Sequence, residues 1–264
     1  MSRLNLTRLR QMKAEQNKIA MLTAYDASFS HALEQAGVDV ILVGDSLGMV
    51  IQGQESTLPV TVDDIIYHCQ NVVRGSDKVF VIADMPFMSY ANEGQAIANA
   101  ARLMAEGGAQ MVKLEGGAVI ASTIKQLTAR GIPVCAHLGL LPQSVHRVGG
   151  YRVQGRDAET ADELTRDAKT LQDAGADMLV LECVPAALAT KITNTLTIPV
   201  IGIGAGSMCD GQVLVLYDML GLTPGKRPRF SDDFLAKTGT IQSAVTKYVA
   251  DVKSGQFPTL AQQF

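Results

Sequence analysis

One short pattern that recurs along the chain constrains its fold more than any other feature. A helical stretch ends in small residues, a run of apolar residues follows, and a charged residue comes next, most clearly at 36–45, 107–115 and 174–182. Glycine just after a helix supplies a left-handed C-cap, and an unbroken apolar run is typical of a strand buried on both faces. The pattern therefore predicts parallel strands that alternate with helices.

Eight strands are expected on this basis, at residues 18–24, 40–43, 79–84, 111–112, 131–137, 178–181, 198–203 and 212–217. Helical patterns separate most of them, and one opens with a Thr160-x-x-Glu163 capping box. Eight such units in 264 residues predict a single domain over residues 1–264, an α/β fold of the (β/α)8 or TIM barrel type. An extra helix is expected at 5–16, and one or two more at 232–253. A doubly wound open sheet is the alternative, because eight strands do not prove closure.

Composition and charge exclude several classes of protein. The chain has 23 Lys and Arg against 26 Asp and Glu, and no basic cluster is dense enough to follow a phosphate backbone. Nucleic acid is therefore not an expected partner. No apolar run approaches the roughly 20 residues that span a bilayer, so no membrane contact is expected and the protein should be soluble and cytoplasmic. Only 19% of residues are charged, which leaves apolar surface for other subunits to cover. The four isolated cysteines are expected to be reduced core residues.

Polar side chains follow the expected strands at the end where a barrel carries its chemistry. They are Tyr25, Asp45, Ser46, Asp84, Lys113, Glu115, His137, Glu182 and the turn Gly202-x-Gly204-x-Gly206. Each alone has an ordinary explanation, since an acid after a strand is often a helix N-cap and a histidine there is often a core residue. Because all carboxyl ends of a barrel meet at one mouth, we expect these groups to converge.

Two connections at the same end are longer than barrel loops usually are. They span 46–61 and 138–157, and the second carries Gly149-Gly150-Tyr151. Loops of this size are commonly lids or binding loops, with a solvated excursion or a subunit contact as the alternatives.

Four of the converging groups are carboxylates, on Asp45, Asp84, Glu115 and Glu182, and they share the mouth with Lys113. Such a cluster repels itself unless cations share the space, and an all-oxygen set without cysteine suits Mg²⁺. His137 is expected to support a ligand or to contact substrate. Lys113 is expected to stay charged and bind a substrate carboxylate. A Schiff base is the alternative, but it needs a neutral amine, which neighbouring carboxylates disfavour.

Two glycine motifs leave other interpretations open. Gly44-Asp45-Ser46-Leu47-Gly48 matches the G-x-S-x-G nucleophile elbow of α/β-hydrolases. An elbow opens a helix, whereas residues 49–53 are not helical in character, and no histidine follows His146 to complete a triad; a hydrolase stays the alternative activity. Gly202-x-Gly204-x-Gly206 lacks the third glycine of a dinucleotide motif but can approach a ligand or phosphate closely. A metal-stabilised barrel that only binds or scaffolds is the non-catalytic alternative.

Several motifs together closely resemble one family, and the match runs from Ile19 to Tyr248. They include Thr23-Ala24-Tyr25-Asp26, Val43-Gly44-Asp45-Ser46-Leu47-Gly48-Met49, Asp84-Met85-Pro86-Phe87-Met88, Val112-Lys113-Leu114-Glu115-Gly116-Gly117, His137-Leu138-Gly139-Leu140, Pro142-Gln143-Ser144 and Leu181-Glu182-Cys183-Val184-Pro185. The sequence resembles the ketopantoate hydroxymethyltransferase family. The resemblance implies a (β/α)8 barrel similar to the phosphoenolpyruvate/pyruvate enzymes. It also implies transfer of a one-carbon unit from the co-substrate 5,10-methylenetetrahydrofolate to 3-methyl-2-oxobutanoate, which makes ketopantoate in pantothenate biosynthesis.

The same resemblance assigns roles to individual residues. Asp45, Asp84 and Glu115 would hold Mg²⁺, directly or through water. The keto acid would contact Asp45, Ser46, Asp84 and Lys113, and Glu182 would accept the proton. Apart from the resemblance, the positions of Tyr25 and His137 at strand ends predict that they support these groups. The family resemblance further implies assembly as a homodecamer.

Overall fold

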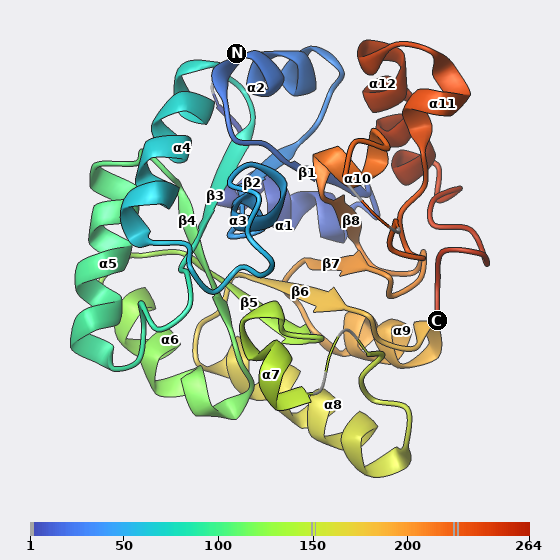
Figure 1. The fold of residues 1–264 in the computed structure, drawn as a ribbon. Coiled ribbons are helices and arrows are strands. Elements are labelled where there is room, and N and C mark those ends of the chain that lie inside the picture. The colour runs from blue at the N-terminus through green and yellow to red at the C-terminus, as the bar shows by residue number, and fades with distance from the viewer. Residues whose placement is uncertain (1–2, 149, 151, 224, 226) are drawn as a thin grey trace.

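The computed structural model describes residues 3–148, 150, 152–223, 225 and 227–264, and its strands lie inside a ring of helices (Figure 1). The strands are β1 Ile19–Thr23, β2 Val40–Val43, β3 Phe80–Asp84, β4 Met111–Glu115, β5 Val134–Gly139, β6 Met178–Glu182, β7 Val200–Ile203 and β8 Gly211–Leu214. All are parallel, and β1 pairs with β8, so the sheet closes into a barrel in chain order. The predicted (β/α)8 fold is confirmed, and the closure excludes an open sheet.

The longer helices cover the outside of this barrel (Figure 1). They are α2 Ala27–Gln35, α4 Val62–Arg74, α5 Glu93–Ala105, α6 Ala121–Thr128, α8 Ala158–Asp173, α9 Ala186–Thr195 and α12 Ile241–Lys253. Shorter pieces are α3 Leu47–Val50, α7 Val145–Val148, α10 Leu216–Met219, α11 Phe234–Thr238 and the 3-10 turns η1 Ala118–Ile120 and η2 Pro142–Ser144. The extra helices predicted at 5–16 and 232–253 are confirmed as α1 Leu6–Ala14 and as α11 with α12.

Two details of the predicted elements are wrong. The last strand was expected over 212–217, but β8 ends at Leu214 and α10 begins at Leu216. The capping box at Thr160 and Glu163 does not form, because α8 begins earlier, after Asp157, whose carboxylate accepts the Thr160 amide at 2.9 Å. An ionised aspartate accepts this hydrogen bond at least as well as a threonine hydroxyl, so the helix starts there.

The register of the sheet decides which side chains become neighbours at the mouth. Asp84 on β3 lies beside Lys113 on β4, and Glu115 two residues further along β4 lies beside His137 on β5. Alternate residues of a strand share a face, so Lys113 and Glu115 point the same way. The strand pairing alone therefore places one lysine, one histidine and two carboxylates together at the carboxyl end of the barrel.

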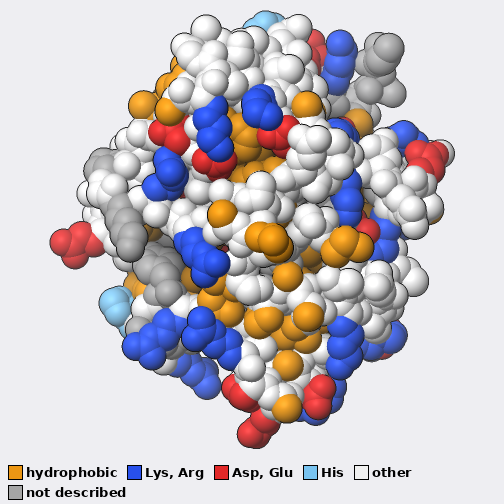
Figure 2. Space-filling view, turned by 90° about the vertical axis from the view of Figure 1, so that its right-hand side faces the viewer, with side chains coloured by type: hydrophobic (Ala, Val, Ile, Leu, Met, Phe, Trp, Pro, Cys, Tyr) orange, Lys and Arg blue, Asp and Glu red, His pale blue; other side chains and the backbone are white. Residues whose placement is uncertain are grey.

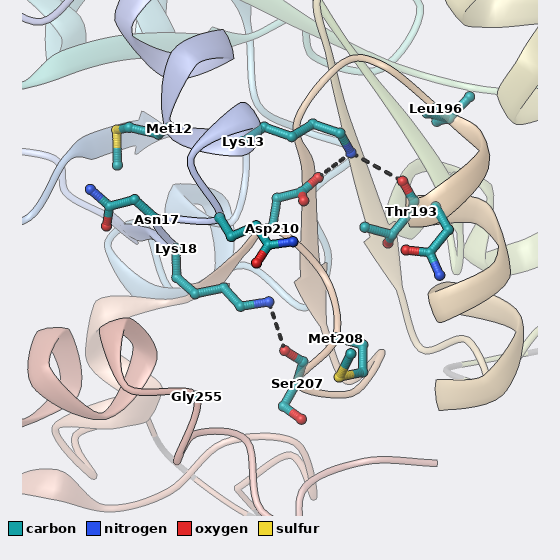
Figure 3. Close-up of a pocket in the computed structure, with 12 residues that line it drawn as sticks. Met12, Lys13, Asn17, Lys18, Thr193, Leu196, Ser207, Met208, Asp210 and Gly255 are labelled. Atoms are coloured by element: carbon teal, nitrogen blue, oxygen red, sulfur yellow. Dashed lines mark hydrogen bonds and ion pairs between the residues drawn. The ribbon is translucent and has the colours of Figure 1, made fainter.

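The amino end of the barrel is braced by α1. Lys13 Nζ at the end of α1 lies 2.6 Å from Asp210 Oδ2 and 3.0 Å from the carbonyl oxygen of Thr193 on α9 (Figure 3). Lys18 Nζ donates to the carbonyl oxygen of Ser207 at 3.2 Å. These residues precede their strands or lie between strands, so the cavity of about 540 Å³ that they line is at the end of the barrel opposite the mouth.

Three expectations from composition concern the apolar surface, the cysteines and the absence of a membrane-spanning segment. Figure 2 shows apolar side chains gathered near the middle of one face, with charged side chains around them. Their coverage by other subunits stays a prediction. Cys69, Cys135, Cys183 and Cys209 are buried and free, as predicted. In the part of the chain that the structure describes, every helix is too short or too polar to cross a membrane.

Candidate active site

A cavity of about 530 Å³ opens at the carboxyl ends of the strands. Seven of the eight singled-out side chains line it: Asp45, Ser46, Asp84, Lys113, Glu115, His137 and Glu182. The eighth, Tyr25, is buried behind Ser46, with its hydroxyl 2.8 Å from Ser46 Oγ. The convergence expected from the strand ends is therefore present.

Lys113 lies at the centre of the carboxylate cluster. Its Nζ lies 2.5 Å from Asp84 Oδ1 and 3.6 Å from Glu115 Oε1, and the side chain is almost fully buried. Burial alone would lower the pKa of Lys113, but Asp84, Glu115 and Asp45 outweigh it and raise the pKa above its usual value. The lysine is therefore held as a cation, which disfavours Schiff-base chemistry at this position.

The three carboxylates around Lys113 carry more negative charge than the lysine cancels. Burial, followed by the charges of Asp84 and Glu115, raises the pKa of Asp45 well above its ordinary value. The Asp84 carboxylate lies against the backbone of Asp45, whose amide donates to Asp84 Oδ2 at 3.1 Å. Gly44 leaves room for this approach, because a Cβ there would lie 3.0 Å from Ser46 Oγ and 3.3 Å from Asp84 Oδ2.

The donor set fits a hard divalent cation by type and charge. Carboxylate oxygens are the ligands that Mg²⁺ prefers, and buried Glu115 Oε1 has no hydrogen-bond partner among the described residues. Among those residues, however, no three His, Cys, Asp or Glu side chains converge as a ready-made metal site. Lys113 and Gln143 instead hydrogen-bond one oxygen of each carboxylate, namely Asp84 Oδ1, Asp45 Oδ2 and Glu115 Oε2, so a cation would bind through the other oxygens.

His137 lies between two carboxylates. Its Nδ1 is 3.3 Å from Glu115 Oε1 and its Nε2 is 3.3 Å from Glu182 Oε2, as ion-pair contacts without hydrogen-bond geometry. Burial and Lys113 lower the pKa of His137, but Glu115 and Glu182 outweigh both and raise it to about 9. Glu182, at the end of the neighbouring strand β6, is the least buried of the three and lines the cavity.

Ser46 has the surroundings of a binding group. The Tyr25 hydroxyl connects it to Thr23 Oγ1, which lies 2.9 Å from Tyr25 and also accepts the Leu216 amide at 3.0 Å. The prediction that the stretch from Met49 is not helical is wrong for its first two residues, because α3 spans Leu47–Val50. Ser46 nevertheless lacks the strain of a nucleophile elbow, since its φ of −51° and ψ of −20° are ordinary right-handed values.

Sequence reasoning missed three polar residues at the site, of which two are buried and Tyr90 is partly buried. Gln143 in η2 donates to Asp45 Oδ2 at 2.9 Å, and Tyr90 donates to Gln143 Oε1 at 2.6 Å. Asp218 on α10 lines the cavity and accepts from Thr223 Oγ1 at 2.6 Å, and burial raises its pKa. Gln143 belongs to a motif of the resemblance, but no pattern assigned it or the other two a role.

The outer part of the cavity has a different character. Phe230 and Phe264 line it together with Arg229, whose guanidinium lies 5.1 Å from the centre of the Phe264 ring. Gly204 packs against the same two rings, so the turn Gly202-x-Gly204-x-Gly206 approaches side chains of this chain closely. The long connections contribute Met49, Thr57, Leu140 and Pro142 to the wall, and Gly149 and Tyr151 lie outside the described residues.

Comparisons with known proteins bear on this site. Residues 3–260 match the family described as ketopantoate hydroxymethyltransferase. The 3-methyl-2-oxobutanoate hydroxymethyltransferase of Nitrosococcus oceani is 66% identical over 260 residues, which cover 98% of each chain.

Solved structures share the fold at low identity. Phosphonopyruvate hydrolase in complex with oxalate and Mg²⁺ has a TM-score of 0.65 at 13% identity and covers 97% of this chain and 96% of its own. Phosphoenolpyruvate phosphomutase from Streptomyces platensis subsp. rosaceus has a TM-score of 0.63 at 15% identity, covering 96% of both. The predicted likeness to the phosphoenolpyruvate/pyruvate barrels is thus confirmed for the fold.

Proposed function

The chain belongs to the ketopantoate hydroxymethyltransferase family, whose named members hydroxymethylate 3-methyl-2-oxobutanoate, and from this premise we propose the donor, the metal and the residue roles. The donor is 5,10-methylenetetrahydrofolate, the metal is Mg²⁺, and the keto acid reacts as its enolate. The product is ketopantoate, for pantothenate biosynthesis. Assembly as a cytoplasmic homodecamer of single-domain subunits is part of the same proposal.

One observation carries the proposal: Asp45, Asp84 and Glu115 lie at or just beyond the ends of three adjacent strands and surround a single buried lysine, Lys113. This excess of negative charge suits a divalent cation, and Lys113 and Ser46 supply the positive charge and the hydroxyl that bind a substrate carboxylate. An α-keto acid offers the matching groups, a carboxylate beside a carbonyl.

Each side chain then has a stated task in the reaction. Asp45, Asp84 and Glu115 would hold Mg²⁺, which when bound polarises the keto carbonyl and stabilises the negative charge of the enolate. Lys113 and Ser46 orient the carboxylate. Glu182 accepts the proton from C3, and its contact with the His137 ring at 3.3 Å directs the carboxylate. C3 then attacks the methylene carbon of the folate as the bond from that carbon to one folate nitrogen breaks. Water displaces the second nitrogen, so its oxygen becomes the product hydroxyl. Tetrahydrofolate leaves with one proton from the water and the one that Glu182 took from C3.

The outer part of the cavity would receive the folate. The small keto acid fills only part of the 530 Å³, and the remaining wall carries Phe230, Phe264 and Arg229. Aromatic rings of the folate can pack against the phenylalanines, and its carboxylates can pair with the arginine.

Deuterium exchange tests the assignment of Glu182. Enolisation needs only metal, keto acid and base, so the wild-type protein should exchange the C3 hydrogen of 3-methyl-2-oxobutanoate with D₂O when folate is absent. The substitution Glu182→Gln keeps the shape but removes the base, so exchange and hydroxymethyl transfer should both fall by at least ~100-fold. Exposed Glu163→Gln on α8 is the matched control and should leave both rates unchanged.

Two results would contradict these roles. Exchange at the wild-type rate in Glu182→Gln would move the base elsewhere, with His137 the next candidate. Full turnover after exhaustive chelation of divalent ions would exclude the metal, whereas the proposal expects loss of turnover and its recovery with Mg²⁺.

A further inference from the structure

Gln143 connects the long loop after β5 to the carboxylate cluster. It is 6% exposed and lies in η2, the first structured turn of that loop. Its side-chain Nε2 donates to Asp45 Oδ2 at 2.9 Å and to the carbonyl oxygen of Met85 at 3.0 Å. Its backbone amide donates to Glu115 Oε2 at 3.1 Å. One residue of the β5 loop thus contacts carboxylates that come from β2 and β4.

Tyr90 fixes the direction of this amide. The Tyr90 hydroxyl donates to Gln143 Oε1 at 2.6 Å and accepts the Glu115 amide at 3.3 Å. Both hydrogens of the Gln143 side-chain amide face acceptors and its oxygen faces a donor, so a flipped amide would lose these hydrogen bonds. The orientation that remains directs one N–H at Asp45 and the other at the carbonyl oxygen of Met85.

The neutral amide of Gln143 and the cation of Lys113 affect the carboxylates differently. Lys113 cancels charge on the carboxylates it touches, whereas Gln143 orients Asp45 and Glu115 and leaves their negative charge in place. It occupies one oxygen of each carboxylate. A cation would need that retained charge and those oriented oxygens.

We propose that Gln143 is a positioning residue that sets Asp45 and Glu115 for Mg²⁺, and that it makes cation binding depend on the seating of the β5 loop. The inference rests on the proposed function for the identity of the cation. Because the loop supplies the donors, Mg²⁺ and the seated loop should stabilise one another.

Binding of MgCl₂ alone, measured by calorimetry on the folded protein, tests this step. Gln143→Ala should weaken Mg²⁺ binding by about 10- to 100-fold, as expected when a partner of a metal ligand is removed. Tyr90→Phe should weaken it in the same direction but less. Gln154→Ala is the matched control, because Gln154 lies in the same loop and its side-chain amide donates to the Arg152 carbonyl oxygen, away from the carboxylate cluster.

Two further measurements separate positioning from a merely structural role. Saturating Mg²⁺ should restore kcat of Gln143→Ala to within a few-fold of wild type while its apparent KM for Mg²⁺ stays raised. Amide hydrogen exchange of residues 139–147 should slow when MgCl₂ is added to the wild type. At the same concentration it should not slow in Gln143→Ala.

Two results of the Mg²⁺-binding measurements would overturn the inference. Wild-type Mg²⁺ affinity in folded Gln143→Ala overturns this inference alone, and if that variant does not fold, wild-type affinity in Tyr90→Phe overturns it. A wild-type protein that binds no Mg²⁺ overturns the inference together with the metal of the proposed function.

Discussion

At the scale of single residues, the hydroxyl of Ser46 separates two chemistries. It shares a hydrogen bond with Tyr25 at 2.8 Å, not with an imidazole, and this suits a group that binds a carboxylate. Loss of the hydroxyl should raise the free energy of activation for hydroxymethyl transfer by about 1 to 3 kcal/mol. Ser46→Ala should therefore reduce kcat/KM by roughly 5- to 150-fold. Steady-state kinetics with Ser254→Ala, an exposed serine on the far side of the fold, provides the comparison.

A hydrolase would respond differently to the same substitution. Loss of a triad nucleophile costs ~10⁵-fold or more, which lies far outside the range expected for a binding serine. Covalent labelling of Ser46 by an organophosphate would establish the hydrolase and remove the serine from substrate binding.

The origin of each site residue in the fold decides whether the sequence could predict it. Asp84, Lys113 and Glu115 end apolar runs, and in a parallel barrel such ends must meet, so their convergence follows from the pattern. Gln143 and Tyr90 lie in connections whose paths no periodicity determines. Their hydrogen bonds depend on where those loops run after the barrel has formed, and only the structure shows it.

At the scale of elements, the strands were predictable and the short helices were not. A run of apolar residues specifies a buried strand, whereas the single turn of α3 follows from the contacts of its loop with the barrel. The start of α8 shows a second source of error. Asp157 and Thr160, three residues apart, can both cap a helix, and the structure shows that Asp157 does so.

One bracing contact between elements can be tested on its own. Glu34 of α2 accepts the amides of Asp77 at 2.8 Å and Lys78 at 2.5 Å, just before β3. Partial burial would raise the pKa of Glu34, but these hydrogen bonds, with that of Val79, outweigh it and lower the pKa. Glu34→Ala should therefore reduce the free energy of unfolding at pH 7 by about 1 to 2 kcal/mol.

The stability lost in Glu34→Ala should depend on pH. A lowered carboxyl pKa contributes stability that is present above the unfolded value and is lost as the pH falls through the folded value. The difference between wild type and Glu34→Ala, followed by urea unfolding, should shrink below about pH 4. A constant difference at every pH would contradict the role of the charge.

At the scale of the whole molecule, closing the barrel forces like charges together. Asp45, Asp84 and Glu115 cannot separate once β2, β3 and β4 are paired, so the folded state bears their repulsion whenever no cation is bound. Without a cation, the protein should therefore be less stable than it would be without this cluster of charges. Functional sites often lower the stability of a protein in this way.

The last prediction follows from that repulsion. Asp45→Asn keeps the size of the side chain and an oxygen for Gln143 but removes one charge. In EDTA the variant should be more stable than wild type by about 1 kcal/mol, a rise of about 2 to 4 °C in the midpoint of thermal unfolding. Because the pKa of Asp45 is raised, its ionisation costs stability, and the advantage of the variant should shrink as the pH is lowered.

Adding MgCl₂ should reverse this order. The wild type gains about 2.7 kcal/mol at a hundred times its dissociation constant, whereas Asp45→Asn, with a weakened site, gains little. Asp177→Asn is the control, because Asp177 is buried beside Arg10 at the other end of the barrel and accepts the Val134 amide at 3.1 Å. That substitution should lower the midpoint equally with and without Mg²⁺. If calorimetry finds Asp45→Asn less stable than wild type in EDTA, the cluster is not under charge repulsion, and the physical argument for a cation at this site fails.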